Sequence, residues 1–158
     1  MLISLATAKM HLRVDGDAEN ALITTWCMAA ESSACEFLNR RVYADTAALN
    51  TAIAAVPETL VAAGAAYQAA LTAAALIDDA VASAAALAGA GAVYLTAQHA
   101  AREIYAGIVV NDQIQAAMLL TLGHLYQNRE DVVLNGSPAA LPMGAHSLLQ
   151  PFRVGLGV

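Results

Sequence analysis

The sequence predicts an all-α protein: a small helical bundle with a long central helix, an alanine-rich helical insertion and an extended C-terminal arm. Three observations support this prediction. Apolar residues within 18–38 recur at the three- and four-residue spacing of a helix with one apolar face. Residues 42–106 contain 27 alanines in 65 positions, and alanine has the highest intrinsic helix propensity. The alternation of β-branched residues that is typical of strands is missing from this region.

The N-terminal part is expected to form two helices. Ser4 is suited to cap a short helix over residues 5–12. A turn follows, and Asp17 can cap a second helix over residues 18–38. Asn39 can end that helix in the left-handed conformation.

The alanine-rich insertion, residues 42–106, is expected to contain four helices. Pro57 suits a first helical turn, Asp78 suits an N-cap, and Gly89-Ala90-Gly91 is expected to interrupt the run. The predicted helices cover residues 46–56, 57–77, 79–87 and 94–106. The alternative is a low-complexity, partly mobile insertion.

The strongest helical pattern covers residues 113–130, with Asn111 and Asp112 as candidate caps. No residue from Ile114 to Tyr126 carries a formal charge, so this helix is apolar nearly all round. A helix of this kind is buried on more than one side. It is therefore expected at the centre of the bundle or at a subunit interface.

The C-terminal region is turn-rich over residues 135–145, and apolar side chains then reappear at Leu148, Leu149 and Phe152. Each of these gains about 1.5–3 kcal/mol when it is fully buried. Arg153 adds a fork-shaped donor for a carboxylate or for backbone carbonyls. Two interpretations stay open: the segment folds back onto its own bundle, or it is an arm that packs on a neighbouring subunit.

The charge content is too low for an ordinary monomer. Hydrophobic residues make up 59% of the chain and charged residues 13%, whereas a soluble domain carries about 25% charged residues. Either subunits bury a large surface against each other, or the chain enters a membrane. Residues 59–77 and 80–101 are uncharged and long enough to span a bilayer, but their alanine-based apolarity gives only a marginal drive for insertion. No signal peptide is predicted at the N-terminus, so a cytoplasmic origin is expected.

No pattern of catalytic residues, cofactor-binding loop or metal-ligand spacing occurs, so an enzyme is not expected. His99 and Glu103 lie one turn apart, which is more typical of a solvated pair than of two metal ligands without a third. Cys27 and Cys35 are about 12 Å apart along one predicted helix, too far for a disulfide, and are expected to be small buried hydrophobes. The net charge is −6 and the basic residues are scattered, so sequence-specific DNA binding is not expected.

Three segments, taken in order, resemble a known family. The first opens with Leu5-Ala6-Thr7-Ala8-Lys9-Met10-His11-Leu12-Arg13-Val14-Asp15-Gly16-Asp17 and continues with Glu19-Asn20-Ala21-Leu22-Ile23. The second is Ile114-Gln115-Ala116-Ala117-Met118-Leu119-Leu120, followed by His124-Leu125-Tyr126-Gln127-Asn128-Arg129-Glu130. The third is Leu148-Leu149-Gln150-Pro151-Phe152-Arg153. Together they resemble the head–tail connector family of tailed phages with long non-contractile tails. The chain departs from that family at Leu38-Asn39-Arg40, where a Thr-Gly-Arg turn is common, and in its alanine-rich middle.

The resemblance implies one connector domain over residues 1–158, with family-type helices at 4–39 and 112–131, the insertion at 42–106 and a C-terminal arm at 135–158. It also implies a homo-oligomeric ring, dodecameric like the portal, that docks below the portal protein. Such a ring extends the channel, lets genomic double-stranded DNA pass without specific binding, and presents a surface to a downstream stopper or tail-completion protein. The expected location is the head–tail interface of the virion, with no membrane partner.

Candidate residues for the subunit or portal interface come from the apolar helix and from the C-terminal segment. They are Ile114, Met118, Leu119, Leu120, Tyr126, Arg129, Leu148, Leu149, Phe152 and Arg153. Two functions of other classes stay open: a small helical DNA-binding protein, and a membrane-associated, holin-like phage protein. The first would require basic residues on the helix over 18–38, where every charged residue is acidic.

Overall fold

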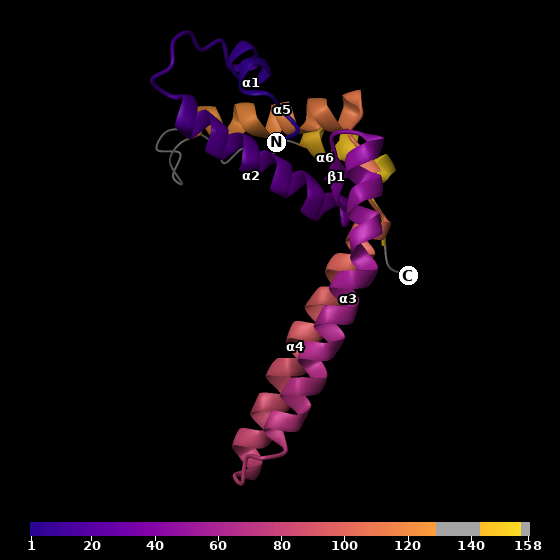
Figure 1. Ribbon diagram of the computed structural model, residues 1–158. Helices are drawn as coiled ribbons and strands as arrows, with labels where there is room; N and C mark the ends of the chain where they lie inside the picture. The colour runs from indigo at the N-terminus through magenta and orange to yellow at the C-terminus, as the bar shows by residue number, and fades with distance from the viewer. Residues whose placement is uncertain (129–142, 156–158) are drawn as a thin grey trace. The chain divides into compact units, whose positions relative to one another are not determined.

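The computed structural model describes residues 1–128 and 143–155 and is mostly helical, as predicted (Figure 1). Its elements are α1 (Leu5–Leu12), α2 (Asn20–Leu38), β1 (Val42–Tyr43), α3 (Thr46–Ala74), α4 (Ala80–Tyr105), β2 (Ile108–Val109), α5 (Asp112–Gln127), α6 (Met143–Leu149) and a 3₁₀ turn (Gln150–Phe152). They divide into two compact units. Unit 1 comprises the described parts of Met1–Asp45 and Ile108–Val158, and unit 2 comprises Thr46–Gly107.

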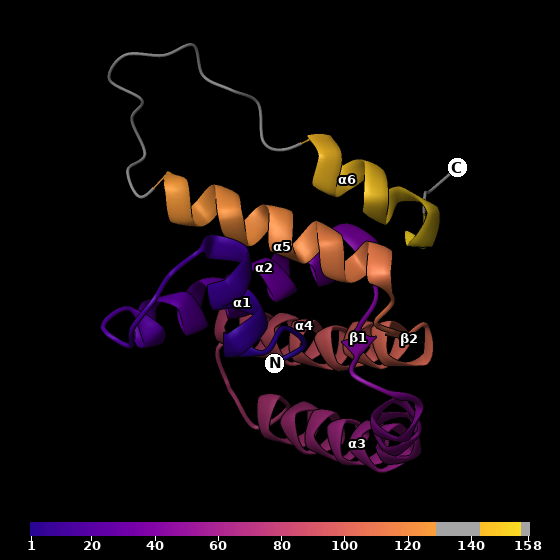
Figure 2. The ribbon, with the colours of Figure 1, turned by 90° about the horizontal axis from the view of Figure 1, so that it is seen from above.

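Helix α5 is the centre of unit 1. It contacts α1, α2 and α6, and Figure 2 shows it running between α6 and the α1–α2 pair. The residues that α5 buries completely are Ile114, Ala117, Met118 and Leu122. The same core includes Ile3, Ala8, Ile23, Cys27, Ala30, Leu38 and Leu149. The all-round apolar character of α5 therefore reflects burial on several sides within its own unit.

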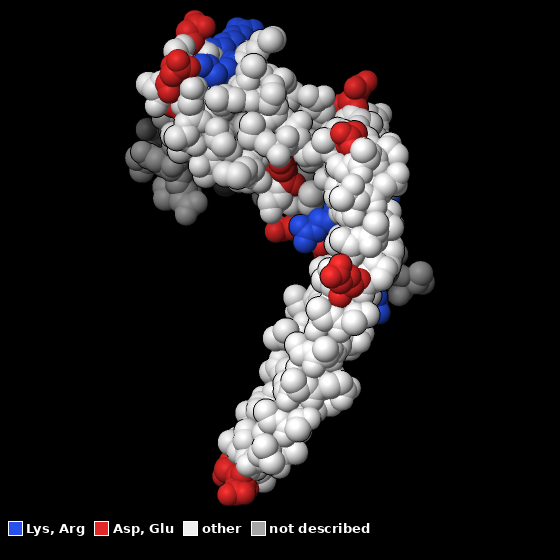
Figure 3. All heavy atoms as spheres, in the orientation of Figure 1, with Lys and Arg blue, Asp and Glu red and all other residues white. Residues whose placement is uncertain are grey.

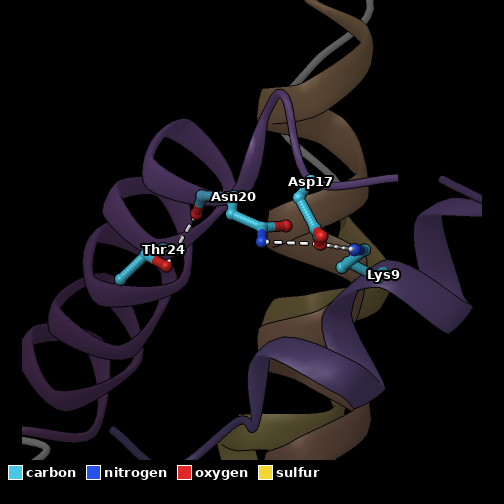
Figure 4. Close-up of polar contacts among 4 residues, drawn as sticks. All are labelled: Lys9, Asp17, Asn20 and Thr24. Carbon is cyan, nitrogen blue, oxygen red and sulfur yellow. Dashed lines mark hydrogen bonds and ion pairs between the residues drawn. The ribbon is translucent and has the colours of Figure 1, made fainter. Parts of the chain in front are cut away.

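The caps of the N-terminal helices agree in part with the prediction. Ser4 caps α1 by accepting a hydrogen bond from the Thr7 amide at 3.1 Å, and Asn39 ends α2 with a φ of 54°. Asp17 does not cap α2, because that helix starts only at Asn20. Its carboxylate instead accepts from Lys9 Nζ at 3.0 Å and from Asn20 Nδ2 at 2.9 Å (Figure 4).

A short parallel pair of strands, which the all-α prediction did not include, joins the two halves of unit 1. Val42 lies opposite Ile108, and Tyr43 lies opposite Val109. The prediction missed it because two residues are too few to show a period of two. Parallel strands need a crossover connection, and the alanine-rich insertion between Tyr43 and Ile108 provides it.

Unit 2 is a hairpin of two long helices, where the sequence predicted four shorter ones. Pro57 lies inside α3 and does not begin a helix, and Gly89-Ala90-Gly91 lies inside α4. A proline inside a helix costs about 3 kcal/mol and each glycine about 1 kcal/mol. The alanine-rich flanks and the contacts between α3 and α4 outweigh these local costs. Asp79, not Asp78, caps α4, by accepting from the Ala82 amide.

The extended C-terminal arm is not what the structure shows over residues 143–152. These residues form α6 and the 3₁₀ turn, and α6 contacts α5 and α2. Leu149 is buried, and Leu148 and Phe152 pack against the core of unit 1. The fold-back interpretation is therefore confirmed for this part. The predicted loop over 135–142 lies outside the described residues.

Candidate assembly surfaces

The structure divides the predicted interface residues into a buried and a partly exposed group. Ile114, Met118 and Leu149 lie inside the core of unit 1. They have no surface to offer a partner, so the prediction is corrected for these three. The apolar pattern that suggested an interface was the pattern of a core.

The remaining apolar candidates border the core. Leu119, Leu148 and Phe152 are half-buried against it, whereas Leu120 keeps 43% of its surface exposed. The Cδ1 atom of Leu120 lies 3.8 Å from where a side chain at Gly144 would begin. Leu120 therefore points toward Gly144 near the start of α6, and it is the most exposed of the predicted residues on α5.

Tyr126 links the two family-type segments of unit 1. Its hydroxyl donates to Glu19 Oε2 at 2.9 Å, and its ring meets Trp26 edge to face, with the ring centres 5.6 Å apart. These contacts join the end of α5 to the beginning of α2. Tyr126 is thus a structural residue within the subunit, while Arg129 lies outside the described residues.

Arg153 closes a stack at the C-terminal end of α2. The ring of Phe37 lies between His146, stacked at 4.3 Å, and the Arg153 guanidinium, 5.0 Å from the ring centre. Backbone contacts secure the same segment: the Val154 amide donates to the Leu38 carbonyl at 3.0 Å, and Arg40 Nη1 donates to the Phe152 carbonyl at 3.3 Å. Arg153 therefore stacks on the Phe37 ring, and the arginine that donates to a backbone carbonyl here is Arg40.

Helices α3 and α4 pack along a seven-residue repeat, as in a two-stranded coiled coil. On α3 the partly or fully buried positions include Leu49, Val56, Ala63 and Ala70 in one series, and Ile53, Leu60, Tyr67 and Ala74 in the other. On α4 they include Ala90, Ala97 and Ile104, with Tyr94 and Ala101. Tyr67 stacks on Tyr94 at 5.2 Å, and Ser83 Oγ donates to the Ala74 carbonyl at 2.9 Å. Alanines thus alternate with larger side chains along this seam.

An apolar groove follows one side of this seam in two stretches. The first has a volume of about 220 Å³ and lies between Ala52, Ala55 and Thr59 on α3 and Ala97 and Ala100 on α4. The second, of about 200 Å³, continues toward the tip between Ala66 and Val93. The two stretches share one face because their lining residues recur at seven-residue intervals. Alanine methyl groups make up most of the groove lining, and Tyr67 and Tyr94 add aromatic rings in the second stretch.

Large apolar side chains are exposed on the outer sides of the same helices. On α4 they are Val81, 77% exposed, and Leu95, 64% exposed; on α3 the main one is Val61, 73% exposed. No Lys, Arg, Asp or Glu occurs between Glu58 and Asp78 on α3, or between Asp79 and Arg102 on α4. Figure 3 shows this uncharged surface ending in the acidic tip of the hairpin. Among the described helices, α3 and α4 are also long and apolar enough to cross a membrane, and almost none of their residues are buried.

No group of three possible metal ligands occurs in the part of the chain that the structure describes. His99 and Glu103 form the predicted pair, with 3.4 Å between Nδ1 and Oε1. Burial, and then the nearby Glu31 carboxylate, raises the pKa of the Cys27 thiol. A raised pKa is the opposite of what a reactive cysteine needs.

The hairpin surface was the feature that sequence reasoning missed. The uncharged stretches 59–77 and 80–101 were noticed, but only as possible membrane spans. A signal for it was present, because the larger residues on α3 recur every seven positions. The two series are Leu49 and Val56, and Ile53, Leu60 and Tyr67. This spacing would have indicated a helical pair with one seam and free outer faces.

A family model described as phage gp6-like head-tail connector protein matches residues 2–137 of the chain. Neither the curated proteins nor the solved structures contain a match.

Proposed function

Because the chain belongs to the phage gp6-like head–tail connector family, we propose that it forms a ring, dodecameric like the portal, below the portal protein. The ring extends the DNA channel and docks the downstream stopper or tail-completion protein. The observation that carries this proposal is the family match, which extends over α1 to α5. The family is a structural one and implies a location in the virion.

The surface of the hairpin supports assembly. A monomer rarely exposes a large continuous apolar area, and such areas mark interaction sites. Helices α3 and α4 expose large apolar side chains over a length without charge. Neighbouring subunits in a ring would remove this surface from water.

The charge of the chain supports passage of DNA without binding. Binding of a duplex is dominated by cations that neutralise phosphates, whereas this chain has a net charge of −6. Like charge along a lumen keeps the sliding duplex from adhering. We therefore expect no shift of duplex DNA by the free protein at physiological salt, and salt-sensitive micromolar binding would contradict this part of the proposal.

Native mass spectrometry tests assembly directly. The purified protein, alone and mixed with its portal, should give a species with the mass of a closed ring, and electron microscopy should show that species below the portal. Monomers under every condition, with portal present, would refute the proposed function.

A membrane-associated protein is the second candidate, since both helices of unit 2 meet the length and composition of a membrane span. Against it, inserting the hairpin would carry Asp78 and Asp79 across the bilayer, and the drive from alanine is marginal. Flotation with phosphatidylcholine vesicles separates the candidates. A connector stays with the protein fraction, whereas a membrane protein floats with the lipid.

A further inference from the structure

We propose that each hairpin binds the hairpin of the next copy: the outer side of α4 from one copy lies in the α3–α4 groove of its neighbour. This inference rests on the proposed ring and names the surfaces that form it. The groove and the outer side of α4 are different surfaces of one hairpin. Their contact is therefore head-to-tail, the kind that generates a ring when the rotation from one copy to the next closes.

The chemistry of the groove calls for an uncharged, apolar helix. Most of its lining residues are alanines, among them Ala52, Ala55, Ala66 and Ala100. Thr59, Tyr67 and Tyr94 are the lining residues that carry a hydroxyl. A nucleic acid or a charged protein segment would find no complementary charge there. A partner must also remain apolar over the length of the groove.

The outer side of α4 meets this requirement. Val81, Ala88 and Leu95 recur every seven residues on that side and are all exposed. The uncharged part of α4 extends from Ala80 to Ala101, about 33 Å at 1.5 Å per residue. The outer side of α3 fits less well because Glu58 lies beside Val61 there, one turn away.

The area that such a contact buries reaches the lower limit for a specific protein–protein interface. Seating half the circumference of a helix about 10 Å wide over about 33 Å covers about 500 Å². Matched by a comparable area from the groove together with its two rims, one contact buries about 1,000 Å² in total, the lower limit expected of a specific interface. In a closed ring every copy makes the contact twice, once with its groove and once with its α4.

Disulfide trapping in the full-length chain tests the contact. In a Cys35→Ser background, Leu95→Cys is combined with Ala55→Cys or with Ala66→Cys, which place the second thiol in the groove at two positions. Leu95 and the groove lie on different sides of one hairpin, so a disulfide must join two copies. The matched control is Leu95→Cys with Ala54→Cys, whose second thiol lies on the outer side of α3. With portal present, mild oxidation should give a ladder of linked subunits for at least one groove pair and no ladder for the control.

A charge substitution provides the second measurement. Leu95→Asp should lower the yield of ring at least tenfold, because it would place a carboxylate among methyl groups, while leaving helicity by circular dichroism unchanged. Val61→Asp, on the outer side of α3, should assemble as the unmodified protein does. Normal ring formation by Leu95→Asp, or a ladder of linked subunits from the control pair alone, would overturn the proposed contact between hairpins. Neither result would contradict the proposed ring. An unmodified protein that never forms rings would instead refute the proposed function. The surface would be assigned to lipid, and the contact overturned, by two results together. The unmodified protein would float with phosphatidylcholine vesicles and Leu95→Asp would not, and neither groove pair would form a cross-link.

Discussion

One carboxylate on α2 fastens the N-terminal segment of the subunit. Glu31 Oε1 accepts hydrogen bonds from the backbone amides of Leu2 and Ile3, the latter at 3.0 Å, and the Ile3 side chain is completely buried. A hydrogen bond to a charged group contributes about 1.5–3 kcal/mol. The two amides are only partly buried and can find water in a variant, which reduces the loss. We therefore expect Glu31→Ala to lower the free energy of unfolding of unit 1 by about 2–3 kcal/mol.

Urea unfolding followed by the fluorescence of Trp26 measures this effect, because it is the only tryptophan in the chain and lies in unit 1. With a typical dependence of about 1–3 kcal/mol per molar urea, the midpoint should fall by about 1–2 M. The matched control is Glu36→Ala, which removes the same charge from an exposed position on the same helix and should change stability by less than about 0.5 kcal/mol. Equal destabilisation by the two variants would refute the role given to Glu31.

Two further predictions concern unit 1. Tyr126→Phe removes the hydrogen bond to Glu19 but keeps the ring against Trp26, so the free energy of unfolding should fall by about 1 kcal/mol; an unchanged urea midpoint would show that the bond contributes nothing. The hydrogen bond from Lys9, then that from Asn20, lowers the pKa of Asp17 below its ordinary value of 3.8. A carboxyl group whose pKa is lower in the folded state stabilises the fold at pH values above its unfolded pKa. That stabilisation is lost as the pH falls through the pKa of the folded state. The N-terminal turn should therefore loosen only below about pH 4. An NMR titration should find the pKa of Asp17 higher in Lys9→Met, and an unshifted titration would contradict the pairing.

The sequence was most informative where local signals agreed with the packing. The helix boundaries at Ser4, Asn39 and Asn111 follow from side chains and conformations that act within one turn, and the structure confirms them. The helical insertion was equally predictable, because alanine favours helix in almost any surroundings. These features depend on few residues that are close together in the chain.

Features that depend on distant residues could not be predicted. Pro57 and Gly89 are helix breakers by local rules, and the contacts between α3 and α4, together with the alanine-rich flanks, keep both helices continuous. The apolar face of α5 was consistent with both a core and an interface, and the burial of Ile114 and Met118 depends on α1, α2 and α6 closing around it. The fold-back of the C-terminal segment likewise depends on Phe37 and Arg40, more than a hundred residues away in sequence.

The strand pair at Val42 and Ile108 makes the hairpin a module that is separate from the core of unit 1. Parallel pairing brings the two ends of the insertion to adjacent strands, about 4.8 Å apart. The junction between unit 1 and the insertion therefore stays the same, whatever sequence lies between β1 and β2. Adding or removing whole seven-residue repeats in the hairpin would therefore leave the core of unit 1 unchanged.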